Sequence, residues 1–161
     1  MSMMSMTTVP IKNNQNKMRK IIVSACLLGN NCKYNGKNNA NQEVIALKKC
    51  YDVIPVCPEC FGNLLIPRLP SERVADGSVI SKNGENVTSA FIKGAEKTLN
   101  IAKENGVKLA VLKERSPSCG CRFIYDGSFT GRIISGSGVT AELLMNNSIK
   151  VVSEEQLSEL S

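Results

Sequence analysis

The sequence predicts an α/β protein, a single-domain Rossmann-like sandwich with a mostly parallel sheet of about four to five strands. Short runs of β-branched residues alternate along the chain with segments of helical periodicity. That order is typical of parallel strands joined by covering helices. The 161 residues fit one domain and can bury a sizeable core. The chain contains no internal repeat and no linker that would divide it.

In the first half of the chain, two main strands flank a short helix. The β-branched run 20–25 predicts the first strand, and Asn41 is placed to cap a helix that carries Val44, Ile45 and Leu47. The run 52–56 predicts the second strand, although its Pro55 requires a strand end or a sheet edge. Residues 78–81, ending at an Asn-Gly turn, predict a small additional strand.

The second half begins with the clearest helix. Its apolar residues recur at helical spacing between the expected N-cap Asn86 and the stop signal Asn105-Gly106. Residues 108–114 predict the third main strand, and residues 123–131 predict a hairpin around Asp126-Gly127.

The chain is expected to end with a helix, a strand and another helix. Ser137 is the expected cap of a helix that carries Val139, Leu143 and Leu144. Residues 150–152 predict the fourth strand, and Ser153 to Gln156 form a capping-box pattern that predicts a final helix.

The net charge of +6 does not indicate a broad surface for nucleic acid. The first twenty residues carry four of the 20 basic residues and no acidic one, so the rest of the chain sets 16 basic against 14 acidic residues. Residues 1–18 are polar and without periodicity, and we expect a disordered N-terminal extension there. The α/β domain is expected over residues 19–161, with Met18 as a candidate start of the functional domain; an extension added for expression is an equal alternative.

Composition also excludes several classes of site. No apolar run is long enough to span a membrane, and no signal peptide is visible. Seven cysteines are an odd number for a disulfide framework, so we expect reduced thiols and a cytoplasmic location. Because the chain has no histidine, Cys₂His₂ zinc sites and Ser–His or Cys–His nucleophile pairs are excluded, and acid–base work falls to carboxylates, lysines or hydroxyls.

Three cysteines share a position relative to the predicted strands. Cys26 follows the first strand, Cys57 the second, and Cys119 lies in the loop after the third. Loops at the carboxyl ends of parallel strands meet in one crevice, so these thiols are expected to converge there. The remaining cysteines, Cys32, Cys50, Cys60 and Cys121, have no such shared placement, and Cys50 is expected to be a small buried residue.

The motif Cys57-Pro-Glu-Cys60 leaves three further readings open. A thioredoxin-like redox pair requires a helix after the motif, which the following glycine and prolines oppose. A zinc site requires a second cysteine pair, for which only Cys119-Gly-Cys121 is available. In the third reading the thiols are merely buried small residues.

Seven motifs together resemble, in order, those of the thiouracil desulfidase family, from about Ile21 to Glu155. They are VSACLLGNNCKYNG (Val23–Gly36), PVCPE (Pro55–Glu59), IPRLPSE (Ile66–Glu72), NVTSAFIKGAE (Asn86–Glu96), LKERSPSCG (Leu112–Gly120), IYDGSFTG (Ile124–Gly131) and GSGVTAELL (Gly136–Leu144). The sequence departs from the family pattern at Asn35 and Asn86, where aspartates are expected, at Asn63, where glycine is usual, and at the extra thiol of Cys60.

The resemblance implies a 4Fe-4S cluster held by Cys26, Cys57 and Cys119, with one iron open to bind the substrate sulfur. The implied reaction is a non-redox, hydrolytic conversion of C=S to C=O in a thiolated pyrimidine, with release of hydrogen sulfide. By the same resemblance, Glu59 and Ser116 are expected to be catalytic, and Ser118 and Arg68 to contact the substrate.

The expected substrate is a small thiolated pyrimidine, either the free base or the mononucleotide, in preference to thiolated tRNA. We expect neither a membrane nor a DNA partner. The glycine-rich segment 136–140 would hold one phosphate if its N–H groups were free, and is otherwise an ordinary capped turn. A non-catalytic zinc-binding or redox-sensing cysteine module remains the alternative function.

Overall fold

The computed structural model describes residues 18–160. Its central sheet is parallel, with the strand order β2-β1-β5-β8, and it confirms the predicted fold class. These four strands are β1 (Lys20–Ser24), β2 (Asp52–Val56), β5 (Leu109–Leu112) and β8 (Lys150–Ser153). Pro55 is accommodated because β2 is an edge strand, as the sequence required.

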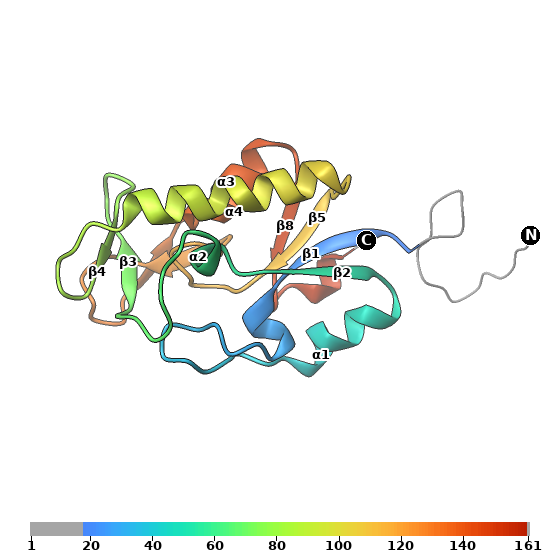
Figure 1. The fold of residues 1–161 in the computed structure, drawn as a ribbon, viewed down its shortest axis with the longest axis horizontal. Coiled ribbons are helices and arrows are strands. Elements are labelled where there is room, and N and C mark those ends of the chain that lie inside the picture. The colour runs from blue at the N-terminus through green and yellow to red at the C-terminus, as the bar shows by residue number, and fades with distance from the viewer. Residues whose placement is uncertain (1–17, 161) are drawn as a thin grey trace, which may run out of the picture.

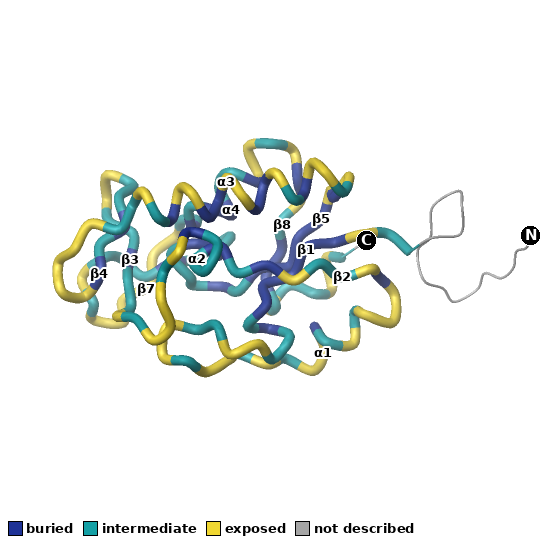
Figure 2. The backbone as a smooth tube through the Cα atoms, viewed as in Figure 1, coloured by how far each residue is buried: buried dark blue, intermediate teal, exposed yellow. Residues whose placement is uncertain are grey.

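Helices cover both faces of the sheet (Figure 1). The long helix α3 (Thr88–Glu104) and α4 (Val139–Asn146) pack on one face, and α1 (Gln42–Ile45) lies on the other. Side chains alternate along β1, so Ile22 joins the core beneath α3 and α4 whereas Ile21 and Val23 join the core on the α1 side. The two central strands, β1 and β5, are accordingly the most continuously buried part of the chain (Figure 2).

Two antiparallel hairpins lie beyond the carboxyl ends of the parallel strands, at the end of the molecule opposite the start of β1 (Figure 1). One joins β3 (Ser71–Arg73) to β4 (Val79–Ser81), and the other joins β6 (Phe123–Tyr125) to β7 (Ile133–Ser135). Glu72 connects them, because its carboxylate accepts hydrogen bonds from the N–H groups of Gly127, at 2.9 Å, and Phe129, at 3.1 Å. The hairpins thus form one rigid wall facing the strand ends.

Two helix starts differ from the sequence prediction, each by one residue. The first cap is as predicted, since the Asn41 side chain accepts a hydrogen bond from the Val44 N–H. The cap positions of α3 and α4 are Val87 and Gly138, each one residue after the expected Asn86 and Ser137.

The predicted final helix is wrong. Gln156 accepts a hydrogen bond from the Ser153 N–H, as in a capping box, but only a turn and a short 3₁₀ helix (Leu157–Glu159) follow.

The predicted extension, residues 1–18, lies outside the described residues except for Met18. Within residues 18–160, no helix combines the length and apolar character that crossing a bilayer requires.

Candidate active site

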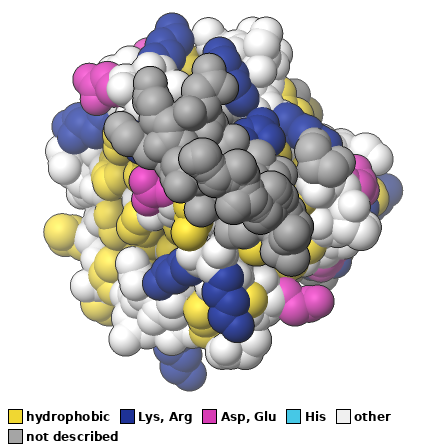
Figure 3. Space-filling model, turned by 90° about the vertical axis from the view of Figure 1, so that its right-hand side faces the viewer, with side chains coloured by type: hydrophobic (Ala, Val, Ile, Leu, Met, Phe, Trp, Pro, Cys, Tyr) yellow, Lys and Arg dark blue, Asp and Glu magenta, His cyan; other side chains and the backbone are white. Residues whose placement is uncertain are grey.

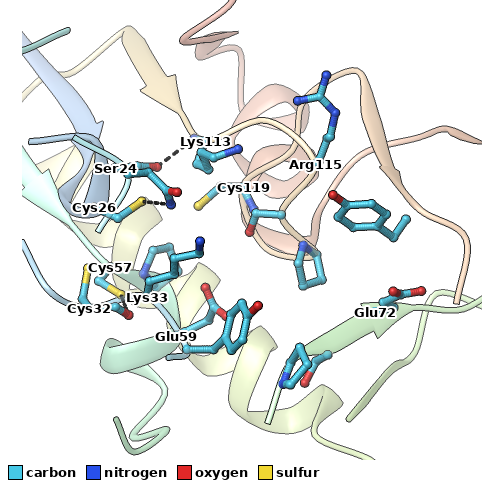
Figure 4. Close-up of a pocket in the computed structure, with 18 of the residues that line it drawn as sticks. Ser24, Cys26, Cys32, Lys33, Cys57, Glu59, Glu72, Lys113, Arg115 and Cys119 are labelled. Carbon is cyan, nitrogen blue, oxygen red and sulfur yellow. Dashed lines mark hydrogen bonds between the residues drawn. The ribbon is translucent and has the colours of Figure 1, made fainter. Parts of the chain in front are cut away.

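The three strand-end cysteines line one cavity of about 440 Å³ (Figure 4). Cys26 lies in a 3₁₀ turn directly after β1, Cys57 follows β2, and Cys119 lies in the loop after β5. The structure therefore brings together the side chains that the strand-end argument predicts to converge. Glu59, Arg68 and Ser116 line the same cavity, which the β3 and β6 hairpins close on the opposite side.

A short helix fixes Cys57 and Glu59. A one-turn helix, α2 (Pro58–Phe61), begins immediately after Cys57 with proline at its first position. It lies almost entirely within the Cys-x-x-Cys motif and ends at Gly62, and no helix forms in the glycine- and proline-containing segment that follows, as the sequence predicts. The helix packs backbone-to-backbone on α3, where a side chain at Gly94 would overlap the Pro58 carbonyl. Glycine in α3 thus allows the approach that sets the position of α2.

The loop that carries Cys119 is held from within and by α4. The hydroxyl of Ser116 accepts hydrogen bonds from the N–H groups of Ser118, at 3.1 Å, and Cys119, at 3.0 Å. The first N–H groups of α4 donate to carbonyl oxygens of Pro117 and Ser118. They are therefore engaged, which does not fit the suggested phosphate site at residues 136–140. Ser118 itself is fully buried, with its hydroxyl 2.8 Å from that of Thr140.

Glu114 closes the base of this loop. Its carboxylate is completely inaccessible to solvent and accepts the N–H groups of Cys121, Arg122 and Phe123 at 3.1–3.2 Å. The Arg122 guanidinium adds an ion pair at 2.9 Å. These charge-assisted hydrogen bonds join Glu114, at the start of the loop, to residues 121–123, at its end. They therefore help to fix the position of Cys119 between the two ends.

Each of the three sulfurs has its own hydrogen-bond donor. The Asn39 amide donates to Cys26 Sγ at 3.4 Å, the Cys60 N–H donates to Cys57, and the Ser24 hydroxyl lies against Cys119. Donors to sulfur stabilise a metal-bound thiolate and tune iron–sulfur centres. Three free thiols with three donors around one cavity fit a three-cysteine cluster site.

The surroundings shift the pKa of each thiol differently. The hydrogen bond with Cys32 lowers the pKa of Cys57 to about 5, against the opposing effect of burial. Burial raises the pKa of Cys26 and, well beyond its usual range, that of Cys119. The three thiols thus differ in acidity, and Cys57 is the most acidic of them. Loading a metal centre must therefore release protons from this site.

Glu59 and Arg68 form an ion pair with 3.4 Å between Nη2 and Oε2. Their side chains are 21% and 11% exposed, so the pair is shielded but reaches the cavity. Burial raises the pKa of the Glu59 carboxyl, and Arg68 opposes the shift. The same guanidinium donates to the carbonyl of Cys32 at 3.1 Å, which joins Glu59 to the loop after β1.

Two other cysteines, Cys32 and Cys50, lie in surroundings that the sequence did not predict. Cys32 shares the cavity with Cys26, Cys57 and Cys119, although no shared placement was expected for it. Cys50 is exposed at the end of a 3₁₀ turn, not a buried small residue. Cys60 and Cys121 are half-buried and do not line the cavity. Ser24, Asn39 and Lys113 are pocket residues that sequence reasoning missed.

No group of three or more Cys, Asp or Glu side chains within residues 18–160 is arranged to hold a metal ion. A 4Fe-4S cluster makes a different demand, because each thiolate binds a different iron and the sulfurs need not meet at one point.

Comparison with known proteins bears on both fold and site. The family model of 2-thiouracil desulfurase matches residues 21–156. The protein YbbK of Bacillus subtilis (strain 168) is 40% identical over 149 residues, which cover 87% of this chain and 99% of YbbK. A solved structure of the 4Fe-4S-dependent thiouracil desulfidase TudS is 42% identical, with a TM-score of 0.83, and the match covers 88% of this chain and 95% of that one. The chain belongs to the 2-thiouracil desulfurase family.

Proposed function

We propose that this protein is a cluster-dependent desulfidase that replaces the sulfur of a thiolated pyrimidine with oxygen and releases hydrogen sulfide. The observation that carries the proposal is the cavity itself: three free thiols from three strand ends, each with a hydrogen-bond donor, beside a shielded carboxylate. The 42% identity to a 4Fe-4S-dependent thiouracil desulfidase supports it. Free thiols at Cys26, Cys57 and Cys119 also suit the reducing cytoplasm.

Cys26, Cys57 and Cys119 would hold the cluster. When bound, it would supply an iron without a protein ligand, a soft Lewis acid suited to a thiocarbonyl sulfur. The protein contributes the shape of the site. Asn39, Ser24 and the Cys60 N–H orient the sulfurs, and the strand ends keep them apart.

Glu59 is the proposed general base and acid. The reaction consumes one water, whose oxygen becomes the new carbonyl oxygen and whose two hydrogens leave with the sulfur. A carboxylate in the cavity can accept the first proton as water adds to carbon and return it to the departing sulfur. Arg68 holds this carboxylate through the 3.4 Å ion pair. The chain contains no histidine that could do this work.

The serines divide between two tasks in this proposal. The Ser116 oxygen accepts two backbone N–H groups, so its own hydrogen is free to be donated into the cavity, toward substrate or water. Ser118 is buried against Thr140 and outside the cavity, so we assign it to the loop and not to substrate contact. Arg68, expected to bind substrate, acts mainly as a brace for Glu59.

The cavity has room for a pyrimidine ring and for a substrate as large as a mononucleotide. Its volume of about 440 Å³ lies within the range of sites that enclose a small ligand. Lys33 and Arg115 line it together with the thiols, and would suit the phosphate of a mononucleotide (Figure 4). We therefore propose a thiouridine mononucleotide or free thiouracil as the substrate.

Anaerobic purification followed by metal analysis tests the proposal. The protein should be brown and contain roughly four iron and four acid-labile sulfide per chain.

Alanine at Cys26, Cys57 or Cys119 should abolish iron binding and sulfide release together, because each change removes one ligand. The matched control is Cys60→Ala, which removes a thiol three residues from Cys57 and should keep the iron and most activity. Stoichiometric zinc without iron, or loss of the cluster in Cys60→Ala with retention in Cys26→Ala, would contradict the assignment.

A further inference from the structure

We propose that Cys32 and Cys57 form a thiol-modification site: in the cluster-free protein they react with a small-molecule disulfide and join in a Cys32–Cys57 disulfide. This bond would close the site to iron. This effect on iron binding rests on the proposed function, because it assumes that Cys57 is a cluster ligand. Formation of the disulfide itself does not depend on that assumption.

Contact between the two residues is the first observation. The Cys57 thiol donates to the carbonyl oxygen of Cys32, with 3.9 Å between sulfur and oxygen, and both side chains line the cavity. They lie next to one another in the cavity wall (Figure 4). Neither is in a disulfide in this structure. A disulfide requires neighbouring Cβ atoms and compatible side-chain torsions, so two cysteines side by side in one wall are candidates for it.

The backbone at Cys32 is held by fewer regular elements than the backbone at Cys57. Cys57 is held between β2 and α2, whereas Cys32 lies in the irregular segment between the first 3₁₀ turn and α1. Two contacts with Arg68 restrain this segment: the guanidinium bond to the Cys32 carbonyl at 3.1 Å and a backbone bond to Tyr34 at 2.7 Å. Both contacts hold the backbone beside Cys57, and neither engages the Cys32 sulfur.

The other cavity thiols are differently engaged. Cys119 is buried and lies against the Ser24 hydroxyl, and Cys26 accepts the Asn39 amide. Cys60 is the one competitor for Cys57, because their side chains are also in contact. However, Cys60 does not line the cavity, whereas Cys32 does. A reagent that enters the cavity therefore meets Cys32 and Cys57 together.

The chemistry requires one oxidant, a small disulfide such as oxidised glutathione. The Cys57 sulfur attacks one sulfur of the reagent, which forms a mixed disulfide and expels one glutathione thiolate. The Cys32 sulfur then attacks the Cys57 sulfur and expels the second glutathione. Two thiols are oxidised to one disulfide, one reagent molecule is reduced to two thiols, and the two protons pass to the glutathione thiolates or to water.

The Cys32–Cys57 disulfide would prevent iron binding at Cys57. A sulfur in a disulfide is no longer a thiolate and cannot bind iron. Cluster insertion would then require prior reduction, and a bound cluster would protect Cys57 by occupying its sulfur. Oxidation would store the empty protein in a reversible form instead of exposing Cys57 to irreversible over-oxidation.

The test uses the full chain, cluster-free and cluster-loaded, treated anaerobically with oxidised glutathione. After denaturation and alkylation, intact mass counts the free thiols, and fragmentation of the digest identifies the joined cysteines. In the cluster-free wild type all but two thiols should be alkylated, with Cys32 joined to Cys57. Cys60→Ser, the matched control, should lose the same two thiols. Cys32→Ser should form no internal disulfide and keep at most one glutathione, on Cys57.

Iron uptake provides the second readout. The oxidised wild type should take up no iron and sulfide until dithiothreitol is added, whereas Cys32→Ser that has never met oxidised glutathione should take them up as the reduced wild type does. A Cys57–Cys60 disulfide in the wild type, or an undiminished loss of two thiols in Cys32→Ser, would overturn the proposed pair. If the disulfide forms but the reduced protein still binds no iron, the modification site stands and the proposed cluster function fails.

Discussion

The charges around the three thiols are arranged for a centre that carries negative charge. Burial raises the pKa of Cys26, and the charge of Lys113 is one of the effects that oppose this shift. Lys113 lies beside Cys119 (Figure 4) and forms an ion pair with Glu154 at 3.2 Å. Its N–H also donates to the Ser24 hydroxyl, which in turn lies against Cys119. One residue after β5 thus connects two of the three sulfurs, and a cation at this position offsets the charge of three thiolates.

The Glu59→Gln variant separates chemistry from cluster binding. Because glutamine cannot exchange the proton that the proposed mechanism requires, sulfide release should fall about 10²- to 10⁴-fold. The iron content should stay at the wild-type value, since Glu59 is not a proposed ligand. The measurements are single-turnover sulfide release and iron analysis of the same anaerobic sample. Glu43→Gln, an exposed change on α1, is the control and should alter neither. Full activity in Glu59→Gln would remove Glu59 from the mechanism.

Glu114 should make stability depend on pH on the acid side. Burial acts to raise the pKa of its carboxyl, but the N–H groups of Arg122 and Phe123 and the Arg122 guanidinium together lower it below the ordinary 4.5. A lowered folded-state pKa means that the stabilisation is fully present above the ordinary pKa and is lost as pH falls through the folded value. Glu114→Gln should therefore destabilise the protein near neutral pH, and the difference should shrink with acidification.

Urea unfolding of the cluster-free chain measures this difference, with the pH varied from neutral to below the ordinary glutamate pKa of 4.5. The exposed Glu96→Gln variant on α3 should change the free energy of unfolding little. A constant difference between wild type and Glu114→Gln at every pH would contradict the ionic role of Glu114.

Residues in the site differ in how far the sequence could predict them. Cys26, Cys57 and Cys119 were found because strand ends are visible in β-branched runs and parallel strands end at one edge. Cys32 was missed because it lies in an irregular segment, whose path depends on Arg68, 36 residues away. Asn39 was missed for the same reason. The burial of Ser118 depends on Thr140 in α4, a contact that no local pattern reveals.

At the scale of elements, tertiary packing decides where helices begin and end. The helix α2 forms although glycine and prolines follow it, because proline suits a first helical position and α3 receives the helix backbone-to-backbone. The capping-box pattern at Ser153 makes its expected contact, yet no helix follows because there is no long apolar stripe for the core to bury. Local signals predicted the central strands and α1, α3 and α4, and they failed for α2 and for the end of the chain.

The α2–α3 contact predicts an unusual response to a helix-favouring substitution. Alanine in place of a glycine inside a helix ordinarily stabilises by about 0.5–1 kcal/mol. Gly94→Ala should instead destabilise by about 1–3 kcal/mol, because the new methyl group would overlap the Pro58 carbonyl and push α2 away. Asn100→Ala, at an exposed position of the same helix, is the control and should be neutral or slightly stabilising.

Thermal unfolding and iron analysis of these two variants test the contact. Displacement of α2 moves Cys57 and Glu59 together, so Gly94→Ala should also bind less iron at equal protein concentration. A Gly94→Ala protein with increased stability and full iron content would show that α2 does not depend on this close approach.

At the scale of the whole molecule, charge is spread and not gathered. On the face of Figure 3, Lys and Arg side chains stand among hydrophobic and acidic ones, and in sequence the chain after residue 20 holds 16 basic and 14 acidic residues. The cavity follows the same pattern, since Glu59 and Glu72 line it together with Lys33, Lys82 and Arg115. Such a distribution suits one phosphate near the site better than a long phosphate backbone.

We therefore expect small thiolated pyrimidines to be better substrates than thiolated tRNA. Binding to a polyanion draws most of its free energy from phosphate neutralisation and weakens steeply with salt, whereas a mononucleotide enclosed in a 440 Å³ cavity gains mainly from contacts with its base. At physiological ionic strength, sulfide release from thiouridine monophosphate should exceed that from intact thiolated tRNA at equal thiocarbonyl concentration, and should change less when salt is raised. A chain beginning at Met18 controls for the charges of Lys12 and Lys17. Comparable turnover of the tRNA, insensitive to salt, would mean that the surface around the cavity reads RNA by contacts other than charge.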